Sequence, residues 1–432
     1  MTSTVEPQDL RIGMFIHLDG GWMSHPFPLS SFKISNAEQI DTIRSLGLKR
    51  VRWSPERSDL PAEAVAGDAG QAGPQGDAGA AATEPVVVVA PVAEDPATRA
   101  RRQAEARAEA EAAALRVCER QYQEACRDLR RVNDALVGEP ERARDGAQAL
   151  TRALLDKMLI DAELCVRVLG EPTGDRHSAH AINVTVVSLL LARSLKMAAP
   201  EMADLGTGCL LHDMGKLALP DRVRLPHDDF TSAEASLYRD HVGHGITQGR
   251  RMGLSPGALL VVAQHHELAD GTGFPKGVTS ERMSVGARIV SLVNFYDNLC
   301  NAATPSKSLT PHEALSRMFA QSRNKFDATI LSGFIHMMGI YPPGSLVQLS
   351  DDRYAMVTSV NSARPLKPQV RVHDPARSHG VHLNLEDCPD LGIRRSLRAS
   401  QLPARAAEVL APRLRVAYFF DVSATPTVEE QL

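Results

Sequence analysis

The sequence lacks the marks of several common protein classes. Aromatic residues make up only 4% of the 432 residues, and apolar runs such as 258–263 fall far short of the about 20 residues that a membrane-spanning helix needs. The N-terminus has no basic region followed by an apolar core, so we expect no signal peptide. A net charge of −4 and a pI near 6.4 argue against a nucleic-acid-binding surface. We therefore expect no membrane and no nucleic acid as partner.

Cysteine is scarce and carries no pattern. The six cysteines form no C-x-x-C pair, which favours reduced thiols in a cytoplasmic protein over disulfides or a zinc site. The hydrophobic content of 43% is enough for a substantial core. The length of 432 residues predicts two or three domains.

The N-terminal quarter divides into two predicted regions. Residues 1–58 are predicted to form a small α/β domain, because residues 10–18 alternate like a strand, 36–46 resemble a short helix and 50–53 resemble another strand. Residues 59–98 are rich in Ala, Gly and Pro and lack periodicity. We expect them to form a disordered linker.

Residues 99–138 are predicted to be helical, with a seam of apolar residues at alternating spacings of three and four. The seam consists of Leu115, Cys118, Tyr122, Ala125, Leu129, Val132 and Leu136. Such a heptad pattern favours a coiled coil, which would make a homodimer through residues 115–136. The same pattern is typical of one amphipathic helix packed on its own catalytic domain. The sequence leaves both open.

The remainder is predicted to be mainly α, with a small β-rich ending. Residues 145–340 are almost wholly helical in pattern, with capping boxes at 231–234 and 310–313. After 342–344 short alternating stretches separated by turns predict a β-rich C-terminal module over residues 341–420. The fold class is therefore a helical bundle flanked by two small domains.

A series of histidines and one aspartate within the helical region indicates metal chemistry. Neutral imidazoles and a carboxylate from several helices can converge on transition-metal ions inside a bundle. Lys216, which follows closely, suits a phosphate oxygen. The candidate ligands are His180, His212, Asp213, His241, His265 and His266.

These motifs, in this order, resemble the HD-GYP domain, a branch of the HD phosphohydrolase superfamily. The resemblance rests on His180 with Asn183-Val184, on His212-Asp213-Met214-Gly215-Lys216, on His241 with Gly245, and on the stretch from His265 to Pro275. Residues 5–55 resemble the small domain of unknown function that often precedes HD-GYP domains. We therefore expect a helical HD-type bundle over residues 145–340.

The resemblance implies a metal-dependent hydrolase of bacterial second-messenger signalling. Characterised HD-GYP members hydrolyse cyclic di-GMP to pGpG or GMP with two or three metal ions, usually iron or manganese, and members contact diguanylate cyclases. The six candidates and Asn294 would be metal ligands, with Asp213 and Lys216 as catalytic residues. The residues expected to bind substrate are Lys216, Asp270, Gly271, Gly273, Phe274 and Pro275.

The sequence departs from the family pattern at four places. Phe274 replaces the tyrosine of Gly-Tyr-Pro, which keeps the ring and its apolar area. Asn294 replaces an aspartate ligand, and an amide oxygen is a weaker donor to a divalent ion. The family's Arg-Pro-Tyr-Arg stretch is missing after residue 299, where Lys307 is the nearby basic residue. Arg176 replaces the glutamate of three-metal members, so we expect two ions.

Three functions fit this pattern. The first is a cyclic di-GMP phosphodiesterase, acting on that or a related cyclic dinucleotide. The second is a weakly active or inactive protein that senses cyclic di-GMP or binds a protein partner, which Asn294 and the missing arginines would favour. The third is an HD-type phosphohydrolase of another nucleotide.

Overall fold

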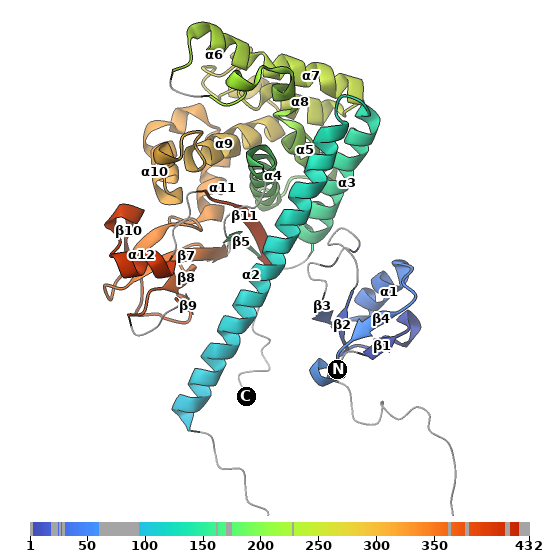
Figure 1. Cartoon of the computed structure of the whole chain (residues 1–432), viewed down its shortest axis with the longest axis vertical. Coiled ribbons are helices and arrows are strands. Elements are labelled where there is room, and N and C mark those ends of the chain that lie inside the picture. Colours follow the sequence, from blue (N-terminus) through green and yellow to red (C-terminus); the bar gives the residue numbers. More distant parts are fainter. Residues whose placement is uncertain are drawn as a thin grey trace, which may run out of the picture. The chain divides into compact units, whose positions relative to one another are not determined.

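The computed structural model describes the chain in several stretches. These are residues 3–18, 25, 27, 31–59, 95–160, 163–169, 175–226, 229–361, 364–375, 380–410 and 415–422. The chain forms two compact units, one of Met1–Gly21 and Leu29–Glu111 and the other of Trp22–Pro28 and Ala112–Leu432 (Figure 1). The predicted linker, 59–98, lies almost entirely outside the described residues.

The first unit is a small α/β domain, as predicted. Its four-stranded antiparallel sheet has the order β1-β4-β2-β3. Asn36 caps the helix through a side chain that accepts a hydrogen bond from the Gln39 amide. Ile16, Ile34 and Ile43 are fully buried. The elements are β1 (Ser3–Val5), η1 (Pro7–Asp9), β2 (Phe15–His17), β3 (Ser31–Lys33), α1 (Ala37–Ser45), β4 (Val51–Trp53) and η3 (Pro55–Arg57).

The second unit is dominated by helices, which confirms the mainly α fold class. Its first helix, α2, begins in the other unit. The α-helices are α2 (Pro96–Ala135), α3 (Pro140–Met158), α4 (Arg176–Ser194), α5 (Ala199–Leu211), α6 (Ser232–Arg239), α7 (His241–Met252), α8 (Pro256–Gln264), α9 (Val285–Cys300), α10 (Pro311–Gln321), α11 (Ala328–Met338) and α12 (Ala404–Leu410). Short 3₁₀ turns are η5 (Met214–Ala218), η6 (Asp221–Val223), η7 (Ser280–Arg282), η8 (Pro305–Lys307), η9 (Arg323–Lys325) and η10 (Ala399–Gln401).

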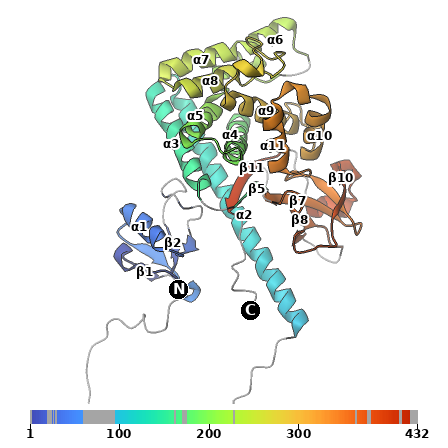
Figure 2. The ribbon, with the colours of Figure 1, turned by 180° about the vertical axis from the view of Figure 1, so that it is seen from behind.

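Helix α4 lies at the centre of the bundle, as both views show (Figures 1 and 2). All residues from Ala181 to Ala192 are buried, and a helix that is apolar on every face is one that other helices surround. Because α4 begins with the segment that carries His180, the core fixes the position of that side chain. Among the described residues, every helix is too short or too polar to cross a lipid bilayer.

The apolar seam of α2 is buried within its own chain. All seven seam residues belong to the main hydrophobic core or pack against it. The Tyr122 hydroxyl also donates to the Ala179 carbonyl at 3.3 Å, and the Gln248 amide donates to the Leu136 carbonyl. The amphipathic-helix interpretation therefore holds. The seam on which the homodimer through residues 115–136 is based packs within the chain, and the homodimer itself stays a prediction.

The second sheet joins the C-terminal region to the helical bundle. Its order is β10-β6-β7-β5-β11, with β8 between β7 and β9 and every pairing antiparallel. Its strands are β5 (Leu164–Val168), β6 (Leu346–Leu349), β7 (Tyr354–Asn361), β8 (Gln369–Val372), β9 (Val381–Asn384), β10 (Ile393–Leu397) and β11 (Tyr418–Val422).

Strand β5 joins the C-terminal sheet from earlier in the chain. It comes from the region predicted to be almost wholly helical, yet it pairs with β7 and β11. The predicted β-rich C-terminal region is confirmed, and its boundary at residue 341 stays a prediction. All five residues of β5 are buried, so the stretch lacks the alternation that marks a strand in sequence.

Candidate metal centre

The six predicted histidine and aspartate ligands converge in the structure. They form two groups, each with its ligand atoms within 4.8 Å of one another. One group contains Asp213, His241, His265 and His266, and the other contains His180, His212 and Asp213. They come from the first turn of α4, the end of α5, the start of α7 and the end of α8. Asp213 is the residue that both groups share.

The carboxylate of Asp213 faces the two groups with different oxygens. Its Oδ1 lies 3.6 Å from the Nε2 atoms of both His241 and His265. Its Oδ2 lies 3.5 Å from His212 Nε2 and 3.8 Å from His180 Nε2. A carboxylate in this position can bridge two cations.

Two polar atoms at the centre are buried without a hydrogen bond. In the described part of the chain, neither Asp213 Oδ1 nor His266 Nε2 has a partner. Burial of an unsatisfied lone pair is costly, and metal coordination removes that cost. The atoms present therefore fit a metal centre.

Three of the histidines are held in the tautomer that metal binding requires. The Nδ1 atoms of His212, His241 and His265 each contact a backbone carbonyl three residues earlier, at 2.7, 2.5 and 2.8 Å. A carbonyl can only accept, so Nδ1 carries the proton and Nε2 keeps its lone pair. The Nε2 atoms of His241 and His265 are 3.3 Å apart, as are those of His212 and His180. Such spacing suits two ligands of one ion.

A carboxylate orients the remaining histidine of the second group. His180 Nδ1 lies 2.6 Å from Oδ2 of Asp297 on α9. The other oxygen of Asp297 accepts hydrogen bonds from the side-chain amides of Asn183 and Asn301, both at 2.9 Å. Asp297 thus directs His180 Nε2 toward the centre. The sequence prediction did not include this network, although Asn183 and His180 share one face of α4.

Burial and neighbouring charges keep four of the candidate ligands, three histidines and Asp213, deprotonated at neutral pH. Burial lowers the pKa of His212 to about 3 and that of His241 to about 4, and it lowers the pKa of His266 well below its usual range. Burial opposes ionisation of Asp213, yet Lys216 and the histidines hold its pKa well below the ordinary value. Metal ligands must be in these states to bind.

Lys216 lies against the centre, as a phosphate contact would. Its Nζ donates to Asp213 Oδ2 at 2.5 Å, and it lies 5.3 Å from the centroid of the Tyr238 ring. Burial alone would lower the pKa of Lys216, but the Asp213 carboxylate raises it above its ordinary value. The side chain therefore carries a positive charge at the edge of the site.

Phe274 packs directly over the centre. Its ring stacks on His266 with centroids 4.3 Å apart and an interplanar angle of 23°. The Phe274 amide donates to the His266 carbonyl at 3.1 Å. Glu267 holds the loop that follows, because its carboxylate accepts from the amides of Lys276 and Val278 at 2.8 and 3.0 Å.

Asp270, Gly271 and Gly273 fix the conformation of this loop. The Asp270 carboxylate accepts from the amide and hydroxyl of Thr272 at 3.0 and 2.6 Å. Gly271 has a φ of +76°, which favours glycine. A Cβ on Gly273 would lie 2.4 Å from the Leu268 amide nitrogen. Substrate binding by these residues stays a prediction.

Asn294 forms its side-chain hydrogen bond within its own helix. It is buried on α9, and its side-chain oxygen accepts from the Asn298 amide at 2.8 Å. Within the described chain no hydrogen bond joins it to the six ligands. Its predicted role as a ligand stays a prediction.

A cavity of about 340 Å³ opens beside the centre. His180, Asp213, His266 and Lys216 line it from the side of the predicted ligands. Residues that the sequence prediction did not place there complete the lining, and among them are Arg176, Tyr238, Asp297, Asn298 and Arg415. A small molecule in this cavity could reach the atoms of the candidate metal ligands directly.

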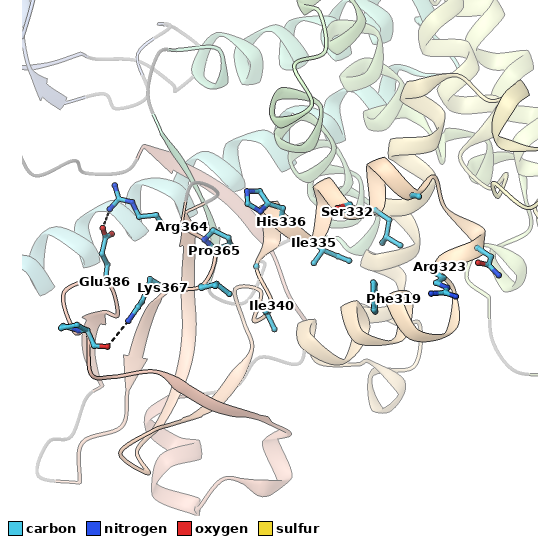
Figure 3. Close-up of a pocket in the computed structure, with 16 residues that line it drawn as sticks. Phe319, Arg323, Ser332, Ile335, His336, Ile340, Arg364, Pro365, Lys367 and Glu386 are labelled. Atoms are coloured by element: carbon cyan, nitrogen blue, oxygen red, sulfur yellow. Dashed lines mark hydrogen bonds and ion pairs between the residues drawn. The ribbon is translucent and has the colours of Figure 1, made fainter.

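A larger groove, of about 1400 Å³, lies elsewhere in the second unit (Figure 3). Phe319 and Ile340 line it from the helical side, and Leu366 lines it from the loop after β7. Arg364 forms an ion pair with Glu386 at its edge. The groove contains none of the candidate metal ligands, so the chemistry belongs to the smaller cavity.

Comparisons with known proteins identify two family domains in the chain. Residues 3–145 match the domain of unknown function DUF3391, and residues 168–330 match the HD domain. The chain is 30% identical over 395 residues to the cyclic di-GMP phosphodiesterase PA4108 of Pseudomonas aeruginosa. The alignment covers 88% of this chain and 86% of that protein.

Two further similarities cover less or are weaker. The cyclic di-GMP phosphodiesterase response regulator RpfG of Xanthomonas campestris is 31% identical over 152 residues, or 35% of this chain and 40% of that protein. The structure of an HD-GYP-type protein, Bd1817 of Bdellovibrio bacteriovorus, aligns with a TM-score of 0.39 at 15% identity, over 77% of this chain and 98% of that one.

A helical domain that gathers histidines around one His-Asp pair defines an HD-type hydrolase. The full-length similarity makes the assignment more specific. The chain belongs to the HD-GYP family of phosphodiesterases, in the form that carries a DUF3391 domain before the HD domain.

Proposed function

We propose that the chain hydrolyses cyclic di-GMP with two divalent ions, iron or manganese. The observation that carries this proposal is the shared carboxylate of Asp213, which turns one oxygen to each group of histidines. The P. aeruginosa relative, similar over most of both chains, is named for cyclic di-GMP hydrolysis. Imidazole and carboxylate donors suit these metals.

The residues divide between the two ions in this proposal. His241, His265 and His266 would hold one, His180 and His212 the other, and Asp213 both. When bound, such ions acidify a water so that it can attack at neutral pH, and they neutralise charge on the phosphate. The cavity is lined by His180, Asp213 and His266, so a bound phosphate could reach these ligands.

The chain's own residues would position and protect the reaction. Lys216 supplies a fixed positive charge for a phosphate oxygen, and Phe274 shields His266 from solvent while offering a ring edge to a base. In the reaction the oxygen of water bonds to phosphorus, the bond to the 3′-oxygen breaks, and that oxygen takes a proton. The first product is linear pGpG, and a second cleavage gives GMP.

The setting follows from the same family. We propose that the chain acts in the cytoplasm of a bacterium, where cyclic di-GMP is made, and that a diguanylate cyclase is a candidate partner. Asn294, bonded to Asn298, favours the alternative of a weakly active sensor. A related substrate is also open, because a Vibrio cholerae relative, 27% identical over 168 residues, is named as specific for 3′3′-cGAMP.

A turnover assay on several nucleotides tests the proposal. The full chain, loaded with Fe(II) or Mn(II), is incubated with cyclic di-GMP, 3′3′-cGAMP and cyclic di-AMP, and products are separated by chromatography. We expect pGpG or GMP from cyclic di-GMP, with a higher kcat/KM than for the other two. Binding of cyclic di-GMP without cleavage would instead establish the sensor, and preference for another nucleotide would establish a different phosphohydrolase.

A further inference from the structure

Two arginines line the cavity beside the metal centre, and one of them, Arg176, stands where three-metal family members have a glutamate. Arg176 belongs to the first turn of α4, four residues before His180, so both side chains leave the same face of the helix. Arg415 comes from the other end of the chain, immediately before β11. Each adds a guanidinium to a cavity that already holds Lys216.

The backbone fixes the Arg176 side chain in place. Its two terminal nitrogens donate to the carbonyls of Ala303 and Asn301, at 3.0 and 2.8 Å. A guanidinium has five N–H donors, so donors remain for a ligand. Burial, and then the charge of Arg415, lower the pKa of Arg176, while the charge of Asp297 raises it. Both arginines line the same cavity.

Hydrogen bonds to the backbone of the next residue, Val416, position Arg415. The Val416 amide donates to the side-chain oxygen of Asn301 at 2.8 Å, and the Val416 carbonyl accepts from Asn183 and Asn301, both at 2.9 Å. The same two asparagines donate to Asp297, which orients His180. The location of Arg415 is thus tied to the location of a candidate metal ligand.

The charges of the cavity are unbalanced on this side. Its two carboxylates, Asp213 and Asp297, are already engaged with Lys216 and with His180. In the described part of the chain, no hydrogen bond or ion pair reaches the guanidinium of Arg415. Two arginines that line one cavity favour a bound anion there, and a guanidinium matches the geometry of phosphate.

We propose that Arg176 and Arg415 form an anion subsite for a phosphate group of the substrate. This subsite rests on the proposed function, and it would bind the second phosphodiester of the cyclic dinucleotide, the one that is not being cleaved. Arg176 and His180 are one helical turn apart, about 6 Å along the axis, so one phosphate can lie at the centre and the other at the subsite. The two arginines would replace the missing Arg-Pro-Tyr-Arg stretch and make β11 part of the site.

A binding experiment tests the subsite without relying on turnover. Cyclic di-GMP is titrated into the metal-free full chain by calorimetry, for the wild type, Arg415→Gln, Arg415→Lys and the control Arg323→Gln. The control removes the same charge from an exposed position outside the cavity. We expect Arg415→Gln to weaken binding by about tenfold or more, the loss typical of a hydrogen bond to a charged group. Arg415→Lys should recover part of the affinity, and Arg323→Gln should stay within about twofold of the wild type.

Equal affinity of Arg415→Gln and wild type, with both folded by circular dichroism, would overturn the subsite. If the metal-free wild type does not bind cyclic di-GMP, inorganic phosphate serves as the probe of the subsite, and the proposed function is judged separately by turnover of the metal-loaded chain. Weaker phosphate binding by Arg415→Gln than by Arg323→Gln would still support the subsite, and equal binding by the two would overturn it.

Discussion

Replacing Asp297 by asparagine keeps the shape of the side chain and removes one acceptor from the network that orients His180. One oxygen of Asp297 accepts from Asn183 and Asn301, and the other accepts from His180 Nδ1 at 2.6 Å. In Asp297→Asn the remaining oxygen keeps the two asparagines, so the new NH₂ group faces His180. Two donors cannot pair, and His180 must move its proton to Nε2 or turn away. Either change removes the lone pair that faces the centre.

The expected loss is confined to one ion. Residues that orient a metal-binding histidine typically contribute about 10–100-fold in metal affinity or activity. Asp297→Asn should therefore weaken the ion bound by His180 and His212 by about that factor, while the ion at His241, His265 and His266 keeps its affinity. Cyclic di-GMP hydrolysis should fall by a similar factor, because both ions act on one phosphate.

The assay is a metal titration followed by inductively coupled plasma analysis, with Asp134→Asn as control. Asp134 is exposed on α2 and lies outside the cavity, so its replacement should change nothing. Two ions of wild-type affinity in Asp297→Asn would refute the orienting role. Loss of both ions together would also refute it, because the two groups would then not be separable.

Three further predictions follow from other parts of the site. Asn294→Asp should tighten metal binding and speed hydrolysis if its oxygen reaches an ion; unchanged metal affinity would show that its role is the bond to Asn298. Gly273→Ala should destabilise the chain by about 1–3 kcal/mol in urea unfolding, because its Cβ would come within 2.6 Å of backbone atoms, whereas Gly243→Ala, with no atom within 4 Å, should not. The metal-free chain should lose stability as the pH falls from about 6.5 toward 4 and 3. An unfolded histidine titrates near the upper value, and the lower two are the folded pKa values of His241 and His212, so only the unfolded state binds protons in that window. His212→Gln should reduce the dependence of the unfolding free energy on pH, and an unchanged dependence would argue against a buried neutral imidazole.

The convergence of the candidate ligands could be predicted from sequence, because their chemistry is concentrated in a few local motifs. His212-Asp213 and His265-His266 lie at helix ends, where the carbonyls of the last turn are free to fix the imidazole tautomer. The order of the motifs along the chain then indicated one common centre. The structure brings these side chains together with a shared carboxylate.

The network behind the ligands could not be predicted, because its members are far apart in sequence. Asn183, Asp297 and Asn301 meet Val416 only when α4, α9 and β11 pack together. A single asparagine or arginine has no spacing that indicates such a partner. For the same reason the cavity-lining role of Arg415 became visible only in the fold.

Two features of the fold could not be decided from the sequence, because one pattern fits two structures. The heptad seam of α2 suits a partner helix from another chain as well as the bundle of its own. The bundle covers the seam, because burying it within the chain costs no loss of translational freedom. Strand β5 is short and wholly buried, so its sequence lacks the alternation of a half-exposed strand.

The central claim is that Asp213 holds both ions, and metal stoichiometry tests it most directly. Wild type and Asp213→Ala are loaded with the same metal, passed through the same desalting column and analysed for ions per chain, with circular dichroism to establish folding. The account predicts two ions in the wild type and weakened binding of both in folded Asp213→Ala, beside loss of only one in Asp297→Asn. Two ions of undiminished affinity in Asp213→Ala would contradict it.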